Sequence, residues 1–219
     1  VEYGGNTTCM EVRSKENDVY IIDAGSGIRE LGNTLMTEYK GRVKARLFIT
    51  HEHWDHIHGF PFFIPAYVPG CEISVYSGDK HLAKKLRKGT LEDIAQGNTE
   101  VFTKEERMNH TKEIFNGQQN VKQGYFPISL DQMGSRLSFH DLKQYEVNVN
   151  GLNASYMMHD AHPGGMFSYQ LSEHGRRIVF AGDYEHDGSG RGQFGENDQN
   201  MIAWARNADA LVIDAQYTP

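Results

Sequence analysis

Six consecutive residues, His51-Glu52-His53-Trp54-Asp55-His56, place four potential metal ligands in the pattern H-x-H-x-D-H. Such a loop can direct His51 and His53 at one cation and Asp55 and His56 at a second. Imidazole nitrogen and carboxylate oxygen suit Zn²⁺, with Mn²⁺ or Fe²⁺ as alternatives. Two divalent cations lower the pKa of a shared water, which supplies a hydroxide for hydrolysis without a protein base. Asp55 is also a candidate catalytic residue. The alternative is a histidine-rich surface turn, which we disfavour because the cluster directly follows an apolar segment.

A site with only four ligands would be open, so further ligands should come from other strand ends. His162 lies between two predicted strands, and the glycines after it let the backbone turn close to a ligand. Asp183 follows the apolar run 178–182 and could bridge both metals. Ordinary turn chemistry is the alternative for both residues. His159 competes with His162 for the ligand role, although we prefer His162, and Asp160 could orient a ligand imidazole.

Other polar residues at strand ends have less specific signals. Asp23 and Asp214 each follow an apolar run, and either could orient a ligand or only cap a loop. His186, three residues after Asp183, is a candidate catalytic proton donor; an exposed loop histidine is the alternative. We expect Trp54 and the segment Phe60–Phe63 to pack the histidine loop against the core rather than to touch a substrate.

Alternating apolar residues and turn signals predict the elements that position these residues. We expect a hairpin formed by Cys9–Arg13 and Val19–Ile22, then a helix that Ser26 caps and that ends near Gly41. The further predicted strands are Arg46–Thr50, Glu72–Tyr76, Tyr145–Val149, Ala154–Met158, Met166–Leu171, Arg177–Ala181 and a buried last strand, Ala210–Ile213. The further predicted helices are Asp79–Lys88 and Asp198–Arg206.

Residues 89–136 have no sustained hydrophobic period, so we interpret them as an irregular insertion of short helices and loops. Aromatic residues in this stretch could stack a nucleobase, but we favour their burial in a small core: Phe102, Phe115, Tyr125 and Phe126. Strands in two groups, each followed by helices, indicate an α/β (α+β) fold in which two sheets pack face to face with helices outside.

Composition excludes several classes of protein. At 219 residues and 38% hydrophobic, one domain spanning 1–219 is the simplest expectation. A net charge of −7 without long basic runs does not favour a broad basic surface, so we do not expect a nucleic-acid partner. Cys9 and Cys71 form no CxxC pair, so we predict reduced thiols. Without a long apolar run or a signal-like start, we expect a cytoplasmic protein with no membrane partner.

The segment Thr50–Pro61 resembles the signature loop of the metallo-β-lactamase superfamily, and within it the ribonuclease Z-like branch that includes cyclic nucleotide phosphodiesterases. Five further motifs support the resemblance, which covers almost the whole chain: Tyr3–Cys9, Asp23–Gly27, His162–Gly165, Gly182–Asp183 and Asp214–Thr218. The resemblance implies a four-layer αββα sandwich and a homodimer.

The resemblance also implies a ligand set. His51, His53 and His162 would hold one metal, Asp55 and His56 the other, and Asp183 would bridge the two. Family members usually have a strand before the first of these motifs. They also usually have a last metal-binding histidine and a Gly-His-Ser segment, which this sequence lacks up to Pro219. We therefore expect the second metal to lack a ligand within these residues. Either terminal elements of the fold are missing from them, or a partner chain or an altered site compensates.

Four functions fit these features. The first is hydrolysis of a small cyclic phosphodiester, such as a cyclic nucleotide. The second is RNA 3′-end cleavage, which needs a basic arm to grip the backbone. Residues 87–113 hold five Lys or Arg against six Asp or Glu, so they favour the small substrate. The third is hydrolysis of a carboxylic ester, lactone or β-lactam, and the fourth is a non-catalytic regulatory role.

Overall fold

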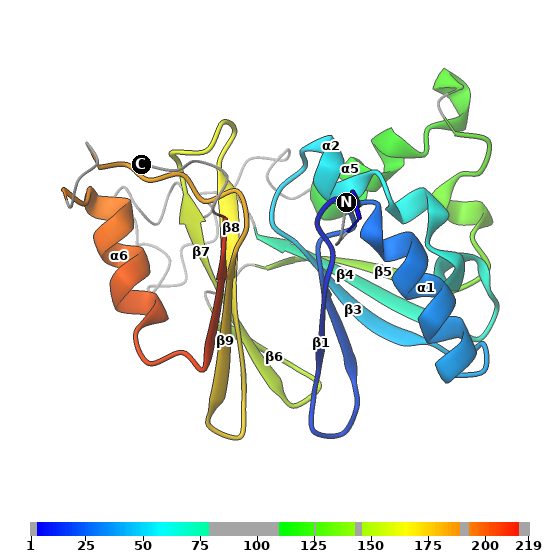
Figure 1. Ribbon diagram of the computed structural model, residues 1–219. Coiled ribbons are helices and arrows are strands. Elements are labelled where there is room, and N and C mark those ends of the chain that lie inside the picture. Colours follow the sequence, from blue (N-terminus) through cyan, green and yellow to red (C-terminus); the bar gives the residue numbers. More distant parts are fainter. Residues whose placement is uncertain (1–3, 79–109, 125, 143–145, 189–192, 215–219) are drawn as a thin grey trace, which may run out of the picture. The chain divides into compact units, whose positions relative to one another are not determined.

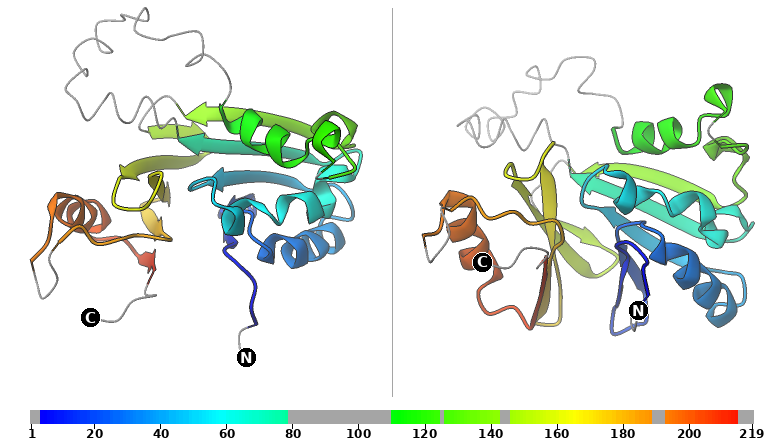
Figure 2. Two further views of the ribbon diagram at one scale, coloured as in Figure 1. Left: turned by 90° about the horizontal axis from the view of Figure 1, so that it is seen from above. Right: turned by 45° about the horizontal axis from the view of Figure 1, so that its top comes forward.

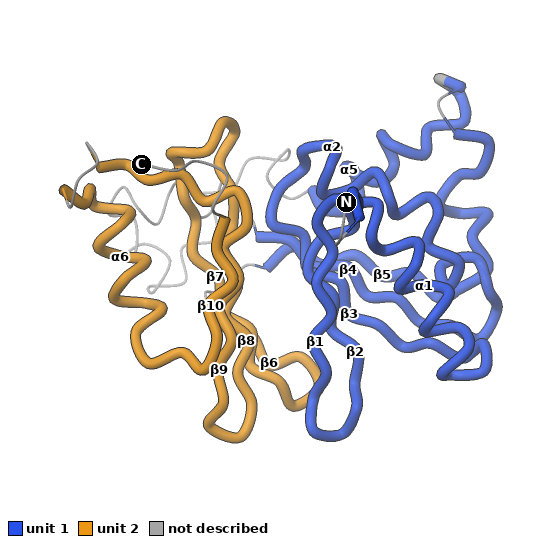
Figure 3. Tube along the Cα trace, in the orientation of Figure 1, with its two compact units in different colours: residues 1–143 blue, residues 144–219 orange. Residues whose placement is uncertain are grey.

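The computed structural model describes residues 4–78, 110–124, 126–142, 146–188 and 193–214 (Figure 1). The chain divides into two compact units, residues 1–143 and 144–219 (Figure 3). Each unit contains one five-stranded sheet, which confirms the mixed α/β class and the two groups of strands. The predicted helix Asp79–Lys88 and residues 89–109 of the predicted insertion lie outside the described residues. The single-domain boundaries and the four-layer order stay predictions.

The sheet of the first unit has the strand order β1-β2-β3-β4-β5. Its strands are β1 (Met10–Arg13), β2 (Val19–Ile22), β3 (Lys44–Ile49), β4 (Glu72–Gly78) and β5 (Arg136–Leu142). The pair β1–β2 is the predicted antiparallel hairpin, and the remaining pairs are parallel. Because parallel strands end at the same edge of a sheet, the segments that follow β2, β3, β4 and β5 begin at one edge.

Helices cover one face of this sheet (Figure 2). They are α1 (Gly27–Glu38), α2 (Trp54–Ile57) and α5 (His110–Gln118), with 3₁₀ turns at Phe60–Phe62, Ile64–Tyr67, Val121–Gln123 and Leu130–Gln132. Ile28 and Leu35, one helical face of α1, pack with Phe115 of α5 in the same core as strand residues such as Leu47 and Val75. Full burial of one such side chain stabilises the fold by about 1.5–3 kcal/mol.

Ser26 precedes α1 as predicted, but its hydroxyl makes no capping hydrogen bond to the helix. Instead Ser26 Oγ accepts a hydrogen bond from the backbone N–H of Thr7 (2.8 Å). Thr7 Oγ1 in turn accepts one from the N–H of Ser26 (2.8 Å). The side chain that would cap an isolated helix therefore joins α1 to the segment before β1.

The strand β5 was not predicted: residue 136 ends the predicted insertion, and no element was predicted for residues 137–142. Its sequence, Arg-Leu-Ser-Phe-His-Asp-Leu, does alternate, and Leu137 and Phe139 pack against the core. Ser138 and His140 alternate with them, and so project from the opposite face of the strand. The alternation was present in the sequence, but four polar residues among seven weakened its apolar signal.

The sheet of the second unit has the order β10-β9-β8-β7-β6. Its strands are β6 (Glu146–Val149), β7 (Leu152–His159), β8 (Met166–Glu173), β9 (Arg176–Ala181) and β10 (Ala210–Ile213). Consecutive strands β6 to β9 pair antiparallel, whereas β10 is parallel to β9. The helix α6 (Glu196–Ala205) makes the crossover between them, and its Met201 packs with Val179 and Ala181.

The prediction that the strand Ala210–Ile213 is buried is wrong. The strand forms, but all four side chains are exposed. Among the residues that the structure describes, β10 pairs with β9 alone. An apolar sequence alone does not show whether a strand is central or at an edge. No helix among the described residues is long and apolar enough to cross a membrane.

Gly59 allows two loops to meet behind the histidine cluster. Its N–H donates to the carbonyl of Ala24 (2.8 Å), and a Cβ at this position would overlap the carbonyl oxygen of Gly25. We therefore expect Gly59→Ala to lower the free energy of unfolding by about 1–3 kcal/mol, the usual cost of overpacking. Urea denaturation would measure the change.

Gly117 is the matched control. It lies within α5, and a Cβ there would meet nothing within 4 Å. Gly117→Ala should leave stability unchanged or raise it by about 0.5–1 kcal/mol, because alanine favours helix. Equal unfolding midpoints for the two variants would contradict the close approach at Gly59.

Candidate metal centre

The histidine loop leaves the end of β3 and is held by the turn between β2 and α1. The N–H of Ala24 donates to the carbonyl of His56 (2.7 Å). The N–H of His56 donates to His53 (3.0 Å), and that of His58 to Trp54 (2.7 Å), which closes the short helix α2. Two loops that are separate in the sequence thus fix the backbone of the cluster.

Three imidazoles of the loop converge. The ring centroids of His51 and His53 lie 4.4 Å apart, and those of His51 and His56 lie 4.2 Å apart. His51 and His56 are buried, whereas His53 is exposed. Asp55 contributes a half-exposed carboxylate whose Oδ2 lies 3.4 Å from His56 Nε2. The four residues that the sequence singled out therefore form one cluster within the first unit.

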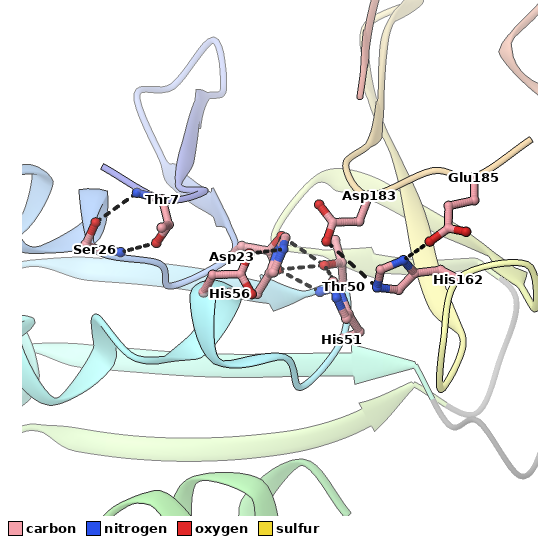
Figure 4. Close-up of polar contacts among 10 residues, drawn as sticks. Thr7, Asp23, Ser26, Thr50, His51, His56, His162, Asp183 and Glu185 are labelled. Carbon is pink, nitrogen blue, oxygen red and sulfur yellow. Dashed lines mark hydrogen bonds and ion pairs between the residues drawn. The ribbon is translucent and has the colours of Figure 1, made fainter. Parts of the chain in front are cut away.

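Asp23 is completely buried beside this cluster (Figure 4). Its carboxylate accepts hydrogen bonds from the Thr50 N–H (2.8 Å) and the Thr50 hydroxyl (2.9 Å), and lies 2.8 Å from His56 Nδ1. Burial raises the pKa of the Asp23 carboxyl, while the hydrogen bonds from His56 and Thr50 act in the opposite direction. Of the two roles considered for Asp23, the contact with His56 is the one that would orient a ligand, because His56 is a candidate ligand.

These contacts define the tautomers of two histidines. Because Asp23 is an acceptor, His56 presents its Nδ1–H to the carboxylate, and its lone pair lies on Nε2. The single hydroxyl proton of Thr50 goes to Asp23, so Thr50 Oγ1 accepts from His51 Nδ1 at 3.0 Å. His51 therefore also carries its lone pair on Nε2. One buried carboxylate prepares both rings to bind a cation through the same nitrogen.

The second unit places His162 against two carboxylates (Figure 4). His162 Nε2 lies 3.8 Å from Asp183 Oδ2, and its Nδ1 lies 2.9 Å from Glu185 Oε1. Glu185 thus orients the ring so that Nε2 is on the side of Asp183. The sequence analysis missed Glu185; its signal was only a carboxylate two residues beyond a candidate ligand.

His159, the competitor of His162, has a different environment at the end of β7. Its Nε2 lies 2.9 Å from Ser168 Oγ on the paired strand β8, and its ring meets that of Tyr184 edge-on at 4.8 Å. These buried contacts support the preference for His162.

Asp214 donates its backbone N–H to Ala181 (3.2 Å) at the end of β10.

His186 is held by Asp198, a residue that the sequence analysis did not consider. Asp198 is buried at the start of α6, and its Oδ1 lies 2.8 Å from His186 Nδ1 and accepts from the Tyr184 hydroxyl at 2.9 Å. Hydrogen bonds from His186 and Tyr184 hold the pKa of Asp198 below its ordinary value, although burial opposes them. Most of the His186 side chain is exposed. The result is an imidazole that reaches solvent from a buried, ionised partner.

The expectation that the loop's aromatic residues pack against the core is only half right. Phe60 and Phe63 are fully buried, but Trp54 and Phe62 are 64% and 54% exposed. Phe115 of the predicted insertion is buried, and Phe126 meets Phe62 edge-on at 6.0 Å. Phe102 and Tyr125 lie outside the described residues.

Similar solved structures support the fold. The metallo-β-lactamase fold protein YhfI from Bacillus subtilis matches with a TM-score of 0.52 and 14% identity, over 95% of this chain and 64% of that one. A diphosphatase from the PhnP family matches with the same TM-score and identity, over 94% of this chain and 58% of that one. The chain thus spans less than two thirds of either structure.

Similar sequences lead to the same family. Ribonuclease Z from Latilactobacillus sakei subsp. sakei (strain 23K) is 23% identical over 95% of this chain and 68% of its own length. Ribonuclease Z from Lacticaseibacillus casei (strain BL23) is 36% identical over 59 residues, which are 27% of this chain and 18% of that protein. The family model described as "Beta-lactamase superfamily domain" matches residues 19–219. With this match and the histidine loop at the end of β3, the chain belongs to the metallo-β-lactamase superfamily.

Proposed function

We propose that this protein is a binuclear metal-dependent phosphodiesterase that hydrolyses a small cyclic phosphodiester such as a cyclic nucleotide. The observation that carries the proposal is a hydrogen-bond network formed by Asp23, Thr50, His51 and His56. It puts the lone pairs of both buried imidazoles on Nε2, the atom that would bind a cation. Members of the superfamily are metal-dependent hydrolases.

The proposed ligands come from both units. In the first unit, His51 and His53 would hold one metal, and Asp55 and His56 the other. In the second unit, His162 would complete the first metal site and Asp183 would bridge the two. The donor set of imidazole nitrogens and carboxylate oxygens fits Zn²⁺, with Mn²⁺ or Fe²⁺ as alternatives. Bound in this way, two cations lower the pKa of a shared water and neutralise charge on the phosphate.

The residues of the chain have separate tasks in this proposal. Asp23 and Glu185 orient the ligand imidazoles, because each carboxylate holds an Nδ1–H. Asp55, half exposed beside His56, is the candidate catalytic carboxylate that would orient the attacking water. His186 would deliver a proton to the leaving oxygen, while Asp198 would stabilise its protonated ring.

Two observations support a small phosphodiester as the substrate: the net charge of the chain and the activities named for its relatives. Ribonuclease Z is named for action on RNA and the PhnP-family protein for action on a diphosphate, so these two enzymes cleave bonds to phosphorus. The net charge of −7 does not favour a long polyanion. A small diester needs few contacts beyond the metals, which supply positive charge locally.

RNA 3′-end cleavage is the second candidate, and the ribonuclease Z matches favour it. A purified, metal-loaded chain separates the candidates when it is given a panel of 2′,3′- and 3′,5′-cyclic nucleotides and a 3′-extended structured RNA. Turnover of a cyclic nucleotide without RNA cleavage supports the first candidate. The homodimer also stays a prediction, and light scattering of the purified chain tests it.

His53→Ala should abolish phosphodiester cleavage, because it removes one imidazole from the ligand cluster. Hydrolysis of bis(p-nitrophenyl) phosphate is expected to fall at least about 10³-fold, since a misassembled site leaves little transition-state stabilisation. Bound metal, measured by elemental analysis, should fall as well. The control is His174→Asn in the β8–β9 turn, where asparagine accepts the positive φ of 48°; equal losses in both variants would contradict the assignment.

Asp23→Asn tests the network that prepares the imidazoles. An amide keeps the shape of the side chain but replaces an acceptor oxygen by a donor facing His56 or Thr50. Metal affinity should therefore fall about 10- to 100-fold, as for other carboxylates that orient ligand histidines. Competition with a chromophoric chelator measures it, and unchanged affinity would show that the network does not set the ligand nitrogens.

His186→Gln should affect substrates according to their leaving groups. Loss of a proton donor is expected to lower kcat about 10²-fold for a cyclic nucleotide, whose alkoxide leaving group needs a proton. Bis(p-nitrophenyl) phosphate should be affected much less, because p-nitrophenolate leaves without one. A uniform loss for both substrates would argue for a structural role of the His186–Asp198 pair.

A further inference from the structure

The histidine loop contains two residues that are not candidate ligands, Glu52 and Trp54, and their environments differ. Glu52 Oε1 lies 3.7 Å from Nε2 of His110, the first residue of α5. The Asp141 carboxylate fixes that helix start by accepting the N–H groups of His110 (3.0 Å) and Thr111 (2.9 Å). Glu52 is thus engaged within the first unit.

Trp54 is 64% exposed although it is the largest apolar side chain of the loop. Among the residues that the structure describes, its indole makes no hydrogen bond and no aromatic ring contact. The neighbouring apolar residues behave differently, because Ile57, Phe60 and Phe63 are all buried in the core. Exposure is therefore a property of this position and not of the whole segment.

The backbone that carries Trp54 is fixed. Its carbonyl accepts from His58 at 2.7 Å, and the adjacent carbonyl of His53 accepts from His56 at 3.0 Å. A tryptophan has only two side-chain torsions, so an indole on a fixed backbone loses little entropy when a ligand covers it. Such a ring is suited to a second planar group, since aromatic faces stack in an offset geometry.

Trp54 lies between two proposed ligands in the sequence. Its Cα is one peptide unit, about 3.8 Å, from those of His53 and Asp55. An indole attached at this position is long enough to meet a ring that is joined through a sugar to a phosphate held at those ligands. Phe115, which the sequence offered as a stacking residue, is buried and cannot take this role.

We propose that Trp54 is a specificity-determining residue that stacks against the aromatic base of a nucleotide whose phosphate occupies the metal site. This inference rests on the proposed function, because it requires phosphate at the ligands beside Trp54. Stacking on Trp54 would favour the binding of nucleotides over that of phosphodiesters that carry no planar ring.

The test measures binding of two product-like ligands to the zinc-loaded full chain. AMP carries a base, whereas ribose 5-phosphate has the same sugar phosphate without one. The chain has two tryptophans, so a Trp204→Phe background leaves Trp54 as the only indole. AMP should quench Trp54 fluorescence, and ribose 5-phosphate should not.

Calorimetric titration then gives affinities for the variants. Trp54→Ala should weaken AMP binding about 5- to 150-fold, the range for loss of one base–aromatic stack, and leave ribose 5-phosphate within about twofold. Trp54→Phe should retain most of the affinity for AMP. Phe62→Ala is the matched control, because Phe62 is also exposed but lies outside the ligand cluster, and it should change neither affinity.

Other results overturn the inference. Equal affinity of the wild-type chain for the two ligands, equal weakening of both by Trp54→Ala, or no binding of AMP would each do so. Turnover of bis(p-nitrophenyl) phosphate and of cyclic nucleotides is measured separately. Selective loss of AMP affinity in a chain that hydrolyses none of these substrates would support the stacking role while refuting the proposed reaction.

Discussion

The buried carboxylate of Asp23 is the constraint on which the histidine cluster depends. A charge in the core is costly unless donors surround it, and here Thr50 and His56 supply those donors. The same hydrogen bonds fix which nitrogen of His56, and through Thr50 which nitrogen of His51, carries a lone pair. The same hydrogen bonds thus stabilise the carboxylate and orient the proposed metal ligands.

Close packing of the backbone holds that hydrogen-bond network in place. Ala24 follows Asp23 and donates to the carbonyl of His56, while Gly59 brings the far end of the loop back to Ala24. Helix α5 reinforces the loop from outside, because Gln118 Nε2 donates to the carbonyl of Ile57 (2.8 Å) and Phe115 packs on Phe60. A fixed scaffold of this kind lets ligand atoms keep their positions without a cation to gather them.

In the second unit, carboxylates also orient imidazoles, but the residues are different. Glu185 orients His162 toward Asp183, and Asp198 at the start of α6 orients His186 toward solvent. In each pair a carboxylate holds Nδ1, which leaves Nε2 for the ligand or proton-transfer role. A carboxylate that pairs with an imidazole is therefore found in both units, at His56, His162 and His186.

The sequence by itself determined the histidine cluster, most strands, and helices α1 and α6, because spacing and hydrophobic period are local properties. Tertiary structure alone decided which carboxylate meets which imidazole: Asp23, Glu185 and Asp198 each act across many residues of chain. It also decided exposure, which depends on neighbours that an apolar pattern does not specify. Trp54 and the edge strand β10 are exposed for that reason, although their sequences indicate burial.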